Sequence, residues 1–478
     1  MRQRIRWGSA LLALALVATA CTSWPAWRAP KAALSIDGVT VIHVRGGTDR
    51  GVTTDVVADQ RVVVDGDEIV WVGPDGEGAP AERHVEGAGR FLIPGLWDAH
   101  VHFLYDAALT DSMPGLFLDW GVTSVRDTGG HFETLIALRD RLQASGEPAP
   151  RIFVSGPLLD GRHVVYDGAN PSQPPLGTSV PDPDVAARQV AALAEGGADL
   201  IKIYELVSPE VFAALVEAAR EHGLPIASHV PLSMTADVAG PQVDSMEHLR
   251  NIEIACARNW EALLAERLAT LEGWDQPRGY PLRKSLHAAQ RYGAMSNHDT
   301  ARCDEVLATL RGTMQVPTLR LNAFNRARPD RLPEWRDAVV PLPAEVRTRW
   351  RATAEGYRGT ERDPRLADWS LSVVGRMRAA GVPIGAGTDT PIGLAVPGES
   401  LHRELELLVR AGLEPAEALA ASICAPARFI GNDAEVGRIA PGQLADLVLL
   451  EANPLEDIRH TRRIVGVVSQ GRYRVPNK

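Results

Sequence analysis

The sequence predicts an α/β protein, a (β/α)8 TIM-type barrel with a small β-sandwich domain formed from both ends of the chain. Two observations support this fold class. Short apolar runs alternate with helix-like segments through the middle of the chain, as they do in a barrel of parallel strands. Runs rich in β-branched residues, two of them separated by a hairpin signal, occupy the two ends.

The β-rich ends are predicted to pair with each other in one domain. The segment 61–73 (RVVVDGDEIVWVG) contains Asp65-Gly66, a dipeptide typical of a tight hairpin turn. Similar β-branched runs lie at 39–44, 445–451 and 464–472. The predicted boundaries are residues 35–93 and 430–478 for the composite β-sandwich domain, and residues 94–429 for the barrel.

Eight apolar runs are the candidate barrel strands. They are LWDAHVHF (96–103), VTSVRD (122–127), RIFVSG (151–156), DLIKIY (199–204), PIASHV (225–230), QVDSMEH (242–248), QVPTL (315–319) and PIGAGTD (383–389). Helices are predicted between them, for example at 182–197 and 208–223. The second has Ser208 as its N-cap and Pro209 at its first position. In such a barrel the chemistry lies at the carboxyl ends of the strands.

Two connections are too long to be simple loops. Residues 250–314 and 320–370 follow the sixth and seventh predicted strands and carry many charges. We predict that they are helical inserts that cap the mouth of the barrel. Solvated decoration without a role at the site is the alternative.

Charge excludes one class of partner. The formal net charge is −10, and the chain has no long basic run. A nucleic-acid-binding protein normally carries a basic stripe or patch, so no nucleic-acid partner is expected. The expected partner is a small molecule, and self-association into a homo-oligomer is left open.

The N-terminus predicts export. Arg2, Arg4 and Arg6 precede the apolar stretch 10–21 (ALLALALVATAC), a pattern typical of a secretory signal. Because the end of this stretch is similar to a bacterial lipobox, we expect residues 1–20 to be a lipoprotein signal and Cys21 to carry the lipid. Residues 21–34 would then be a tether, and the protein would sit in the bacterial envelope, on the periplasmic face of the outer membrane. A plain cleaved signal is the alternative.

Three further cysteines are scattered along the chain, at 256, 303 and 424. No CxxC pair is present, so the sequence predicts no disulfide framework. At most one bridge can form, and we expect ordinary buried thiols.

Metal-ligating residue types fall at the ends of the predicted strands. His100 and His102 are two residues apart on a strand and therefore project from the same face. Lys202 lies inside an apolar strand, where an unpaired ammonium group is costly. It could pair with a carboxylate, or react with CO₂ to give a carbamate that bridges two metal ions. His229, His248 and Asp389 end the fifth, sixth and eighth strands.

This ordered set resembles the amidohydrolase superfamily over residues 35–475. The matching segments are PGLWDAHVH, GADLIKIY, ASHV, DSMEHL, AGTD and ADLVLLEANPLEDI. The resemblance implies two divalent metal ions, most simply zinc, with a bridging hydroxide as the nucleophile. It assigns His100, His102 and Asp389 to one ion, His229 and His248 to the second, and carboxylated Lys202 to the bridge. Asp389 would also take the proton of the nucleophile and pass it to the leaving amine.

Two other segments, GVTSVRDTGG (121–130) and GESLHRELELLVRAGLEPAEAL (398–419), resemble the imidazolonepropionase-related and prolidase-like branches. That resemblance implies hydrolysis of C–N amide bonds in Xaa-Pro or other dipeptides, or in N-acyl amino acids. The alternatives are a cyclic-amide hydrolase or deaminase of the same superfamily and a non-catalytic binding lipoprotein.

Further side chains are candidates for contact with the substrate. Tyr204, next to the lysine strand, could hydrogen-bond the carbonyl oxygen. His163 and Arg162, after the third strand, could bind a substrate carboxylate. Arg126 is a weaker candidate for that carboxylate, because pairing with Asp127 or packing beneath the loop is expected instead.

Overall fold

The computed structural model describes residues 31–46, 51–170, 173–276, 278–326, 328–358, 363–431 and 437–477. The predicted signal, Cys21 and most of the predicted tether lie outside the described residues. In the part of the chain that is described, no helix is both long and apolar enough to cross a membrane.

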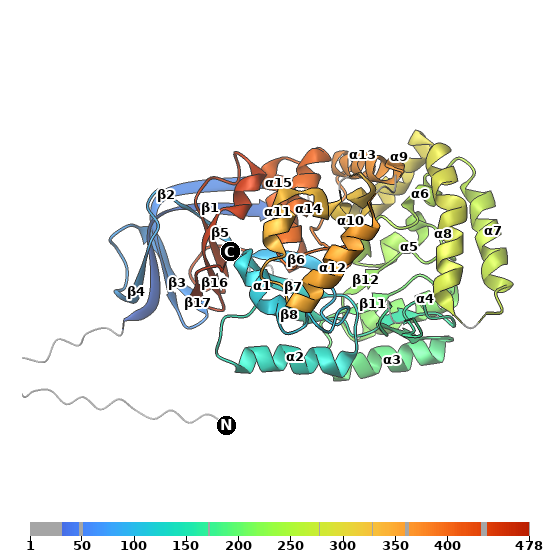
Figure 1. Ribbon diagram of the computed structural model, residues 1–478, viewed down its shortest axis with the longest axis horizontal. Helices are drawn as coiled ribbons and strands as arrows, with labels where there is room; N and C mark the ends of the chain where they lie inside the picture. The colour runs from blue at the N-terminus through green and yellow to red at the C-terminus, as the bar shows by residue number, and fades with distance from the viewer. Residues whose placement is uncertain are drawn as a thin grey trace, which may run out of the picture.

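Strands from both ends of the chain form one eight-stranded sheet, at the left of Figure 1. The strand order is β17-β16-β15-β5-β1-β2-β3, and β4 pairs with β1. The strands are β1 (Ala32–Gly46), β2 (Val52–Asp65), β3 (Glu68–Pro74), β4 (Ala81–Glu86), β5 (Phe91–Pro94), β15 (Leu447–Leu450), β16 (Ile464–Ser469) and β17 (Arg472–Arg474). The sheet has its own apolar core, which includes Ile36, Val62 and Leu447.

One boundary predicted from the sequence needs correction here. The predicted tether ended at residue 34, but Ala32–Leu34 already lie in β1, where Leu34 pairs with Val64. The strands of the predicted β-sandwich are joined by hydrogen bonds into one sheet in the described residues, so their arrangement as a sandwich stays a prediction. The long β1 joins them, because its first half pairs with β4, its second half pairs with β5, and β2 lies along both.

The middle of the chain has a mixed α/β arrangement with parallel strands. One sheet has the order β6-β7-β8 and the other β10-β9-β11-β12-β13-β14, and all neighbours in both are parallel. The strands are β6 (Leu96–Val101), β7 (Val122–Asp127), β8 (Arg151–Val154), β9 (Leu158–Asp160), β10 (Gly177–Ser179), β11 (Ile201–Ile203), β12 (Ile226–Ser228), β13 (Ser245–Glu247) and β14 (Met314–Val316).

Residues 383–390 lie between the ends of these two parallel sheets. Ile384 forms a parallel bridge with Gln315 of β14, and Thr390 forms one with Val101 of β6. The Ala99 amide donates to Ala386, and the Asp389 amide donates to His100. The two sheets are not assigned as one closed sheet, so closure into a barrel stays a prediction.

The helices around the parallel strands begin where the sequence signals place them. In α4 the Ser208 side chain accepts a hydrogen bond from the Val211 amide, and Pro209 occupies the first turn. Phe212 and Leu215 on its inner face are fully buried. These helices are α1 (Met113–Asp119), α2 (Phe132–Ala144), α3 (Pro183–Glu195), α4 (Pro209–Glu221), α5 (Ala236–Ala239), α13 (Arg365–Ala380), α14 (Glu399–Arg410) and α15 (Pro415–Ile430).

Both long connections are largely helical in their described parts, as predicted. The first holds α6 (Ile252–Ala255), α7 (Trp260–Glu272), α8 (Gly279–Ser296) and α9 (Thr300–Thr309). The second holds α10 (Leu319–Asn322), α11 (Pro333–Ala338) and α12 (Ala344–Gly356). Helices α7 and α8 lie at the end of the molecule opposite the eight-stranded sheet (Figure 1).

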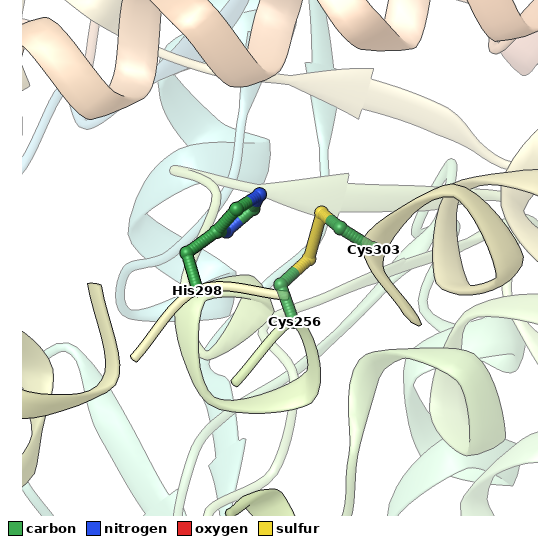
Figure 2. Close-up of side chains that lie close together, drawn as sticks. All are labelled: Cys256, His298 and Cys303. Atoms are coloured by element: carbon green, nitrogen blue, oxygen red, sulfur yellow. A yellow bond between two sulfur atoms is a disulfide. The ribbon is translucent and has the colours of Figure 1, made fainter. Parts of the chain in front are cut away.

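A disulfide between Cys256 and Cys303 corrects the expectation of ordinary thiols (Figure 2). Both cysteines are fully buried, and Cys424 is not part of a disulfide. Backbone hydrogen bonds also join the chain beside the two cysteines. The Asp299 amide donates to the Cys256 carbonyl, and Ala257 forms an antiparallel bridge with His298. The bridge spans 47 residues and closes the excursion that contains α7 and α8.

Removal of this bridge is expected to destabilise the protein. The Cys256→Ala/Cys303→Ala double variant should lose about 2–5 kcal/mol in the free energy of unfolding, because the bridge restricts the unfolded chain. Urea unfolding followed by fluorescence measures the loss. Cys424→Ala, which keeps the bridge, is the matched control. Equal shifts of the midpoint in the two variants would show that the bridge contributes nothing.

Candidate metal centre

Seven of the predicted site residues line one cavity of about 340 Å³. They are His100, His102, Lys202, Tyr204, His229, His248 and Asp389. The parallel strands position six of them, because His100 lies in β6, Lys202 lies in β11, and the other four directly follow β6, β11, β12 or β13. Asp389 lies in residues 383–390, which form bridges to both sheets. All seven are at most 5% exposed. The volume suits a small ligand rather than a polymer.

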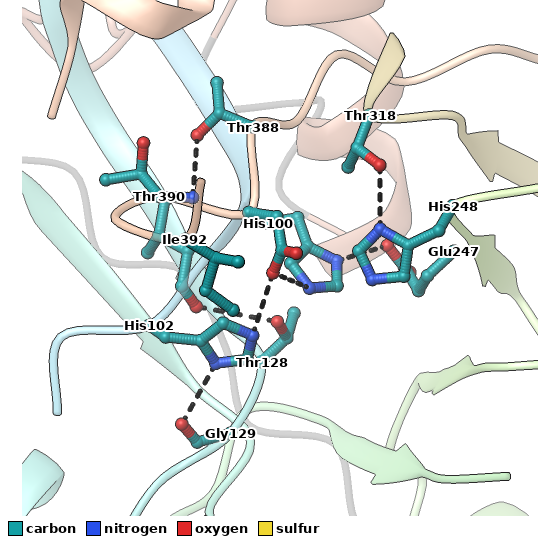
Figure 3. Close-up of polar contacts among 12 residues, drawn as sticks. His100, His102, Thr128, Gly129, Glu247, His248, Thr318, Thr388, Thr390 and Ile392 are labelled. Atoms are coloured by element: carbon teal, nitrogen blue, oxygen red, sulfur yellow. Dashed lines mark hydrogen bonds and ion pairs between the residues drawn. The ribbon is translucent and has the colours of Figure 1, made fainter. Parts of the chain in front are cut away.

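Asp389 and three histidines form the centre of this cavity. Asp389 Oδ1 lies 3.2 Å from His102 Nε2 and 3.4 Å from His100 Nε2. One potential ligand atom from each of His100, His248 and Asp389 lies within 4.8 Å of the others. Figure 3 shows the rings of His100, His102 and His248 gathered at this point. Such a group of nitrogen and oxygen donors suits a divalent transition metal.

The electrostatics of the centre keep its carboxylate ionised. Burial by itself would raise the pKa of Asp389, but His248, His100 and His102 outweigh it and hold the pKa well below its ordinary value. Burial lowers the pKa of His248 well below its ordinary value and that of His229 to about 3. Neutral imidazoles and an ionised carboxylate are the protonation states that a metal requires.

Every one of the four histidines has its Nδ1 engaged, which leaves Nε2 as the ligand atom. The Nδ1 partners are Glu247 Oε2 at 2.6 Å for His100, the Gly129 carbonyl at 3.1 Å for His102, Glu205 Oε1 at 2.7 Å for His229 and Thr318 Oγ1 at 2.7 Å for His248. Three of these contacts are drawn in Figure 3. Partners of this kind fix the tautomer and the ring direction of metal-ligating histidines.

Two buried glutamates that support these histidines were missed by sequence reasoning. Glu205 is held by Arg283 Nε at 3.0 Å and His287 Nε2 at 2.6 Å. Glu247 accepts a hydrogen bond from Arg126 Nη2 at 2.8 Å. Each glutamate is next in sequence to a residue that was singled out, and that was the only signal available.

Arg126 is therefore a supporting residue and not a substrate contact. Besides Glu247, it donates to the Ala99 carbonyl and to Ser245 Oγ, and its guanidinium lies over the Phe429 ring. It does not line the cavity, and its partner is not the expected Asp127. It packs beneath the site, as the second of the two expected arrangements had it.

Lys202 is fully buried, and its Nζ has no hydrogen-bond partner among the described residues. The alternative of an ion pair with a carboxylate is therefore not realised. Burial lowers the pKa of Lys202 to about 8, so the neutral amine is accessible. A buried amine without a hydrogen-bond partner, at the centre of a histidine cluster, destabilises the folded protein. A carbamate on Nζ, shared by two cations, would satisfy it, so the residues present fit a two-metal centre.

The remaining predicted contacts divide into two groups. Tyr204 faces the cavity, with its ring centroid 4.4 Å from that of His229. His163 and Arg162 are not among the lining residues, and Arg162 is exposed. The substrate contact predicted for His163, one of the candidate active-site residues, stays a prediction. Sequence reasoning missed three arginines that do line the cavity, Arg250, Arg283 and Arg291.

The Glu205 network predicts an effect on metal affinity. Glu205→Gln removes the charge that orients His229, so the affinity for the metal at His229 should fall about 10–100-fold. Titration of the metal-free protein with zinc against a competing chelator measures this affinity. Glu195→Gln, an exposed position on α3, is the control. Identical zinc affinities in the two variants would contradict the orienting role.

The chain is similar to several known proteins in sequence and in structure. Residues 365–473 match the model of the amidohydrolase family. The chain is 25% identical over 409 residues to imidazolonepropionase from Streptomyces coelicolor, covering 83% of this chain and 86% of that protein. A crystal structure of a Xaa-Pro dipeptidase with bound methionine aligns with a TM-score of 0.63 at 20% identity, over 92% of this chain and 99% of its own. Bottromycin amidohydrolase aligns with a TM-score of 0.65 at 23% identity, over 92% and 87%.

Proposed function

We infer that this chain, which carries an amidohydrolase family domain and is a hydrolase acting on carbon–nitrogen bonds, is a binuclear metal-dependent enzyme that cleaves amide bonds of dipeptides or N-acyl amino acids. The observation that carries this proposal is the buried, unpartnered Nζ of Lys202 in a cavity with four histidines and Asp389. In a single-metal deaminase or a binding protein, a buried lysine without a partner would have no function.

The metal ligands divide between two ions. We propose that His100, His102 and Asp389 hold one ion, that His229 and His248 hold the other, and that carboxylated Lys202 bridges them. Nitrogen and oxygen donors of this kind suit zinc. When bound, the ions would lower the pKa of water and polarise the scissile carbonyl.

The chain's own groups move the protons and orient the amide. Asp389 is held ionised, so one of its oxygens can accept the proton of the attacking water and deliver it to the leaving nitrogen. Burial raises the pKa of Tyr204 well above its ordinary value, so its hydroxyl keeps its proton. It can therefore donate a hydrogen bond to the carbonyl oxygen as negative charge develops there.

The proposal also covers the fold of the chain. We propose that the two parallel sheets and residues 383–390 form one (β/α)8 barrel, which the bridges of Ile384 and Thr390 support. We propose a separate β domain from the two chain ends, because its sheet has its own apolar core. Assignment of the eight barrel strands as one closed sheet in a crystal structure is the test.

The activity is tested with zinc-loaded protein and three substrate sets: dipeptides, N-acyl amino acids and cyclic amides of the pyrimidine type. Released amino groups are measured by a colorimetric amine assay for the first two sets, and opening of the cyclic amides is followed by the loss of their ultraviolet absorbance. Turnover of either of the first two sets is the expected result. Turnover of cyclic amides alone would support the cyclic-amide hydrolase or deaminase, and no turnover in any set would overturn the proposal.

Export and lipidation are proposed from residues 1–21 of the sequence alone. The basic flank, the short apolar stretch and Cys21 support an envelope lipoprotein. Cys21→Ala is expected to abolish labelling by a fatty-acid analogue and to move the protein from the membrane fraction to the soluble fraction. Unchanged labelling and fractionation would contradict the anchor.

A further inference from the structure

The charged side chains that line the cavity are strongly biased toward positive charge. Besides the proposed metal ligands, which include Lys202, they are Arg250, Arg283 and Arg291. The one acid among the lining residues is Asp389, which the metal centre uses. No carboxylate in the described lining is therefore left to receive a cationic group of a substrate.

Two of these arginines already have anionic partners behind the cavity wall. Arg283 Nε lies 3.0 Å from Glu205 Oε1, and Arg291 Nε lies 3.0 Å from Glu253 Oε1. Both arginines come from the first helical insert, because α8 carries them. Their charges are balanced before any ligand enters.

Arg250 differs from the other two because it has no anionic partner. No carboxylate of the described residues lies within ion-pair distance of its guanidinium, and its Nε is buried without a hydrogen bond. A guanidinium that is largely withdrawn from water and unpaired is costly unless a ligand pairs with it. Its planar fork of donors matches a carboxylate.

The position of Arg250 sets where that carboxylate must be. It follows His248 by two residues, so the two Cα atoms are within about 7 Å of each other. In the proposed function the scissile carbonyl is polarised at the metal ions, one of which His248 would hold. In an N-acyl amino acid the carboxylate is two bonds from the scissile nitrogen. The side chain of Arg250 is long enough to reach a carboxylate at that position.

The charge bias also decides between the two substrate classes left open above. A free dipeptide brings an ammonium group on its acyl side, and no lining acid is left to receive it. An N-acyl amino acid has an uncharged acyl side and the same carboxylate. The apolar part of the wall, with Leu158, Leu176 and Leu366, suits an aliphatic side chain or acyl group.

We propose that Arg250 binds the carboxylate of the amino acid being released, and that the preferred substrates are N-acyl amino acids with an uncharged acyl group rather than free dipeptides. This inference rests on the proposed amide hydrolysis. It assigns Arg250 as the residue that determines specificity.

Four probes test the inference with the zinc-loaded, full-length protein. N-acetyl-L-leucine is the expected substrate, N-acetyl-L-leucinamide lacks the carboxylate, L-alanyl-L-leucine adds the ammonium, and an N-succinyl alkylamine moves the carboxylate to the acyl side. We expect kcat/KM for N-acetyl-L-leucine to exceed that for the carboxamide on the order of 10²-fold. We expect it to exceed that for the dipeptide at least about tenfold.

Variants then assign the preference to Arg250. R250Q should lower kcat/KM for N-acetyl-L-leucine far more than for the carboxamide, so that their ratio falls toward one. R250K, which keeps the charge, should retain part of the ratio. R188Q, at an exposed position on α3, should keep the wild-type ratio. Zinc content of R250Q equal to that of the wild type excludes damage to the metal centre.

The outcomes separate this inference from the function on which it rests. If the wild type hydrolyses acid and carboxamide equally, prefers the dipeptide, or prefers the succinyl compound, the inference is wrong while amide hydrolysis stands. A wild-type preference that R250Q leaves intact would also overturn the assignment. If none of the four probes nor any dipeptide is cleaved, the proposed function fails instead.

Discussion

Replacing Lys202 with alanine is expected to lower kcat/KM at least about 10³-fold and to reduce the zinc content from two equivalents to one or fewer. The carbamate on Nζ is the one proposed ligand shared by both ions, so its loss weakens both sites. Lewis-acid stabilisation of the transition state is worth several kcal/mol, and each 1.36 kcal/mol corresponds to a tenfold change in rate.

The carbamate can be separated from a structural role of the lysine. Protein exposed to ¹³C-labelled bicarbonate should give a carbamate resonance in the wild type and none in Lys202→Ala. Acetate in the buffer should restore part of the activity of the variant, because it can occupy the vacated space as an oxygen ligand. Lys284→Ala, at an exposed position on α8, is the control. A Lys202→Ala variant that is active and fully loaded with metal would rule out the bridge.

Asp389→Asn is expected to lower kcat about 10²–10⁴-fold, the range typical of losing general acid–base catalysis. The amide oxygen can still approach the metal, but the neutral side chain cannot accept the proton of the nucleophile. The three histidines that hold the pKa of Asp389 low lose their anionic partner as well. Steady-state kinetics with saturating zinc measures the loss.

The matched control for this variant is Asp184→Asn, an exposed aspartate in the first turn of α3. It should leave kcat unchanged. Zinc titration of Asp389→Asn shows whether the loss of rate persists when both sites are filled. A kcat within a factor of about three of the wild type at full loading would exclude Asp389 as the proton carrier.

Local patterns were sufficient to predict the strands that position the metal centre. His100 and His102 could be found because two residues of separation on a strand place both rings on one face. Lys202 could be found because an ammonium inside an apolar strand conflicts with its surroundings. His229 and His248 end short apolar runs, so their place at the edge of a parallel sheet follows from the strand pattern.

The supporting residues could not be predicted, because their partners are far away in sequence. Glu247 contacts His100 across 147 residues, and Glu205 contacts His287 across 82. A buried glutamate looks the same in the sequence as an exposed one until the fold supplies its partner. The disulfide of Cys256 and the unpaired guanidinium of Arg250 could not be predicted for the same reason, since both depend on how the first helical insert packs.

The central claim is that two metal ions lie among His100, His102, Lys202, His229, His248 and Asp389. Anomalous diffraction at the zinc edge, from crystals of zinc-loaded protein, tests it directly. The account predicts two neighbouring peaks in this cavity, with density for a carboxyl group on Nζ of Lys202 between them. The absence of zinc peaks from the cavity would contradict the account.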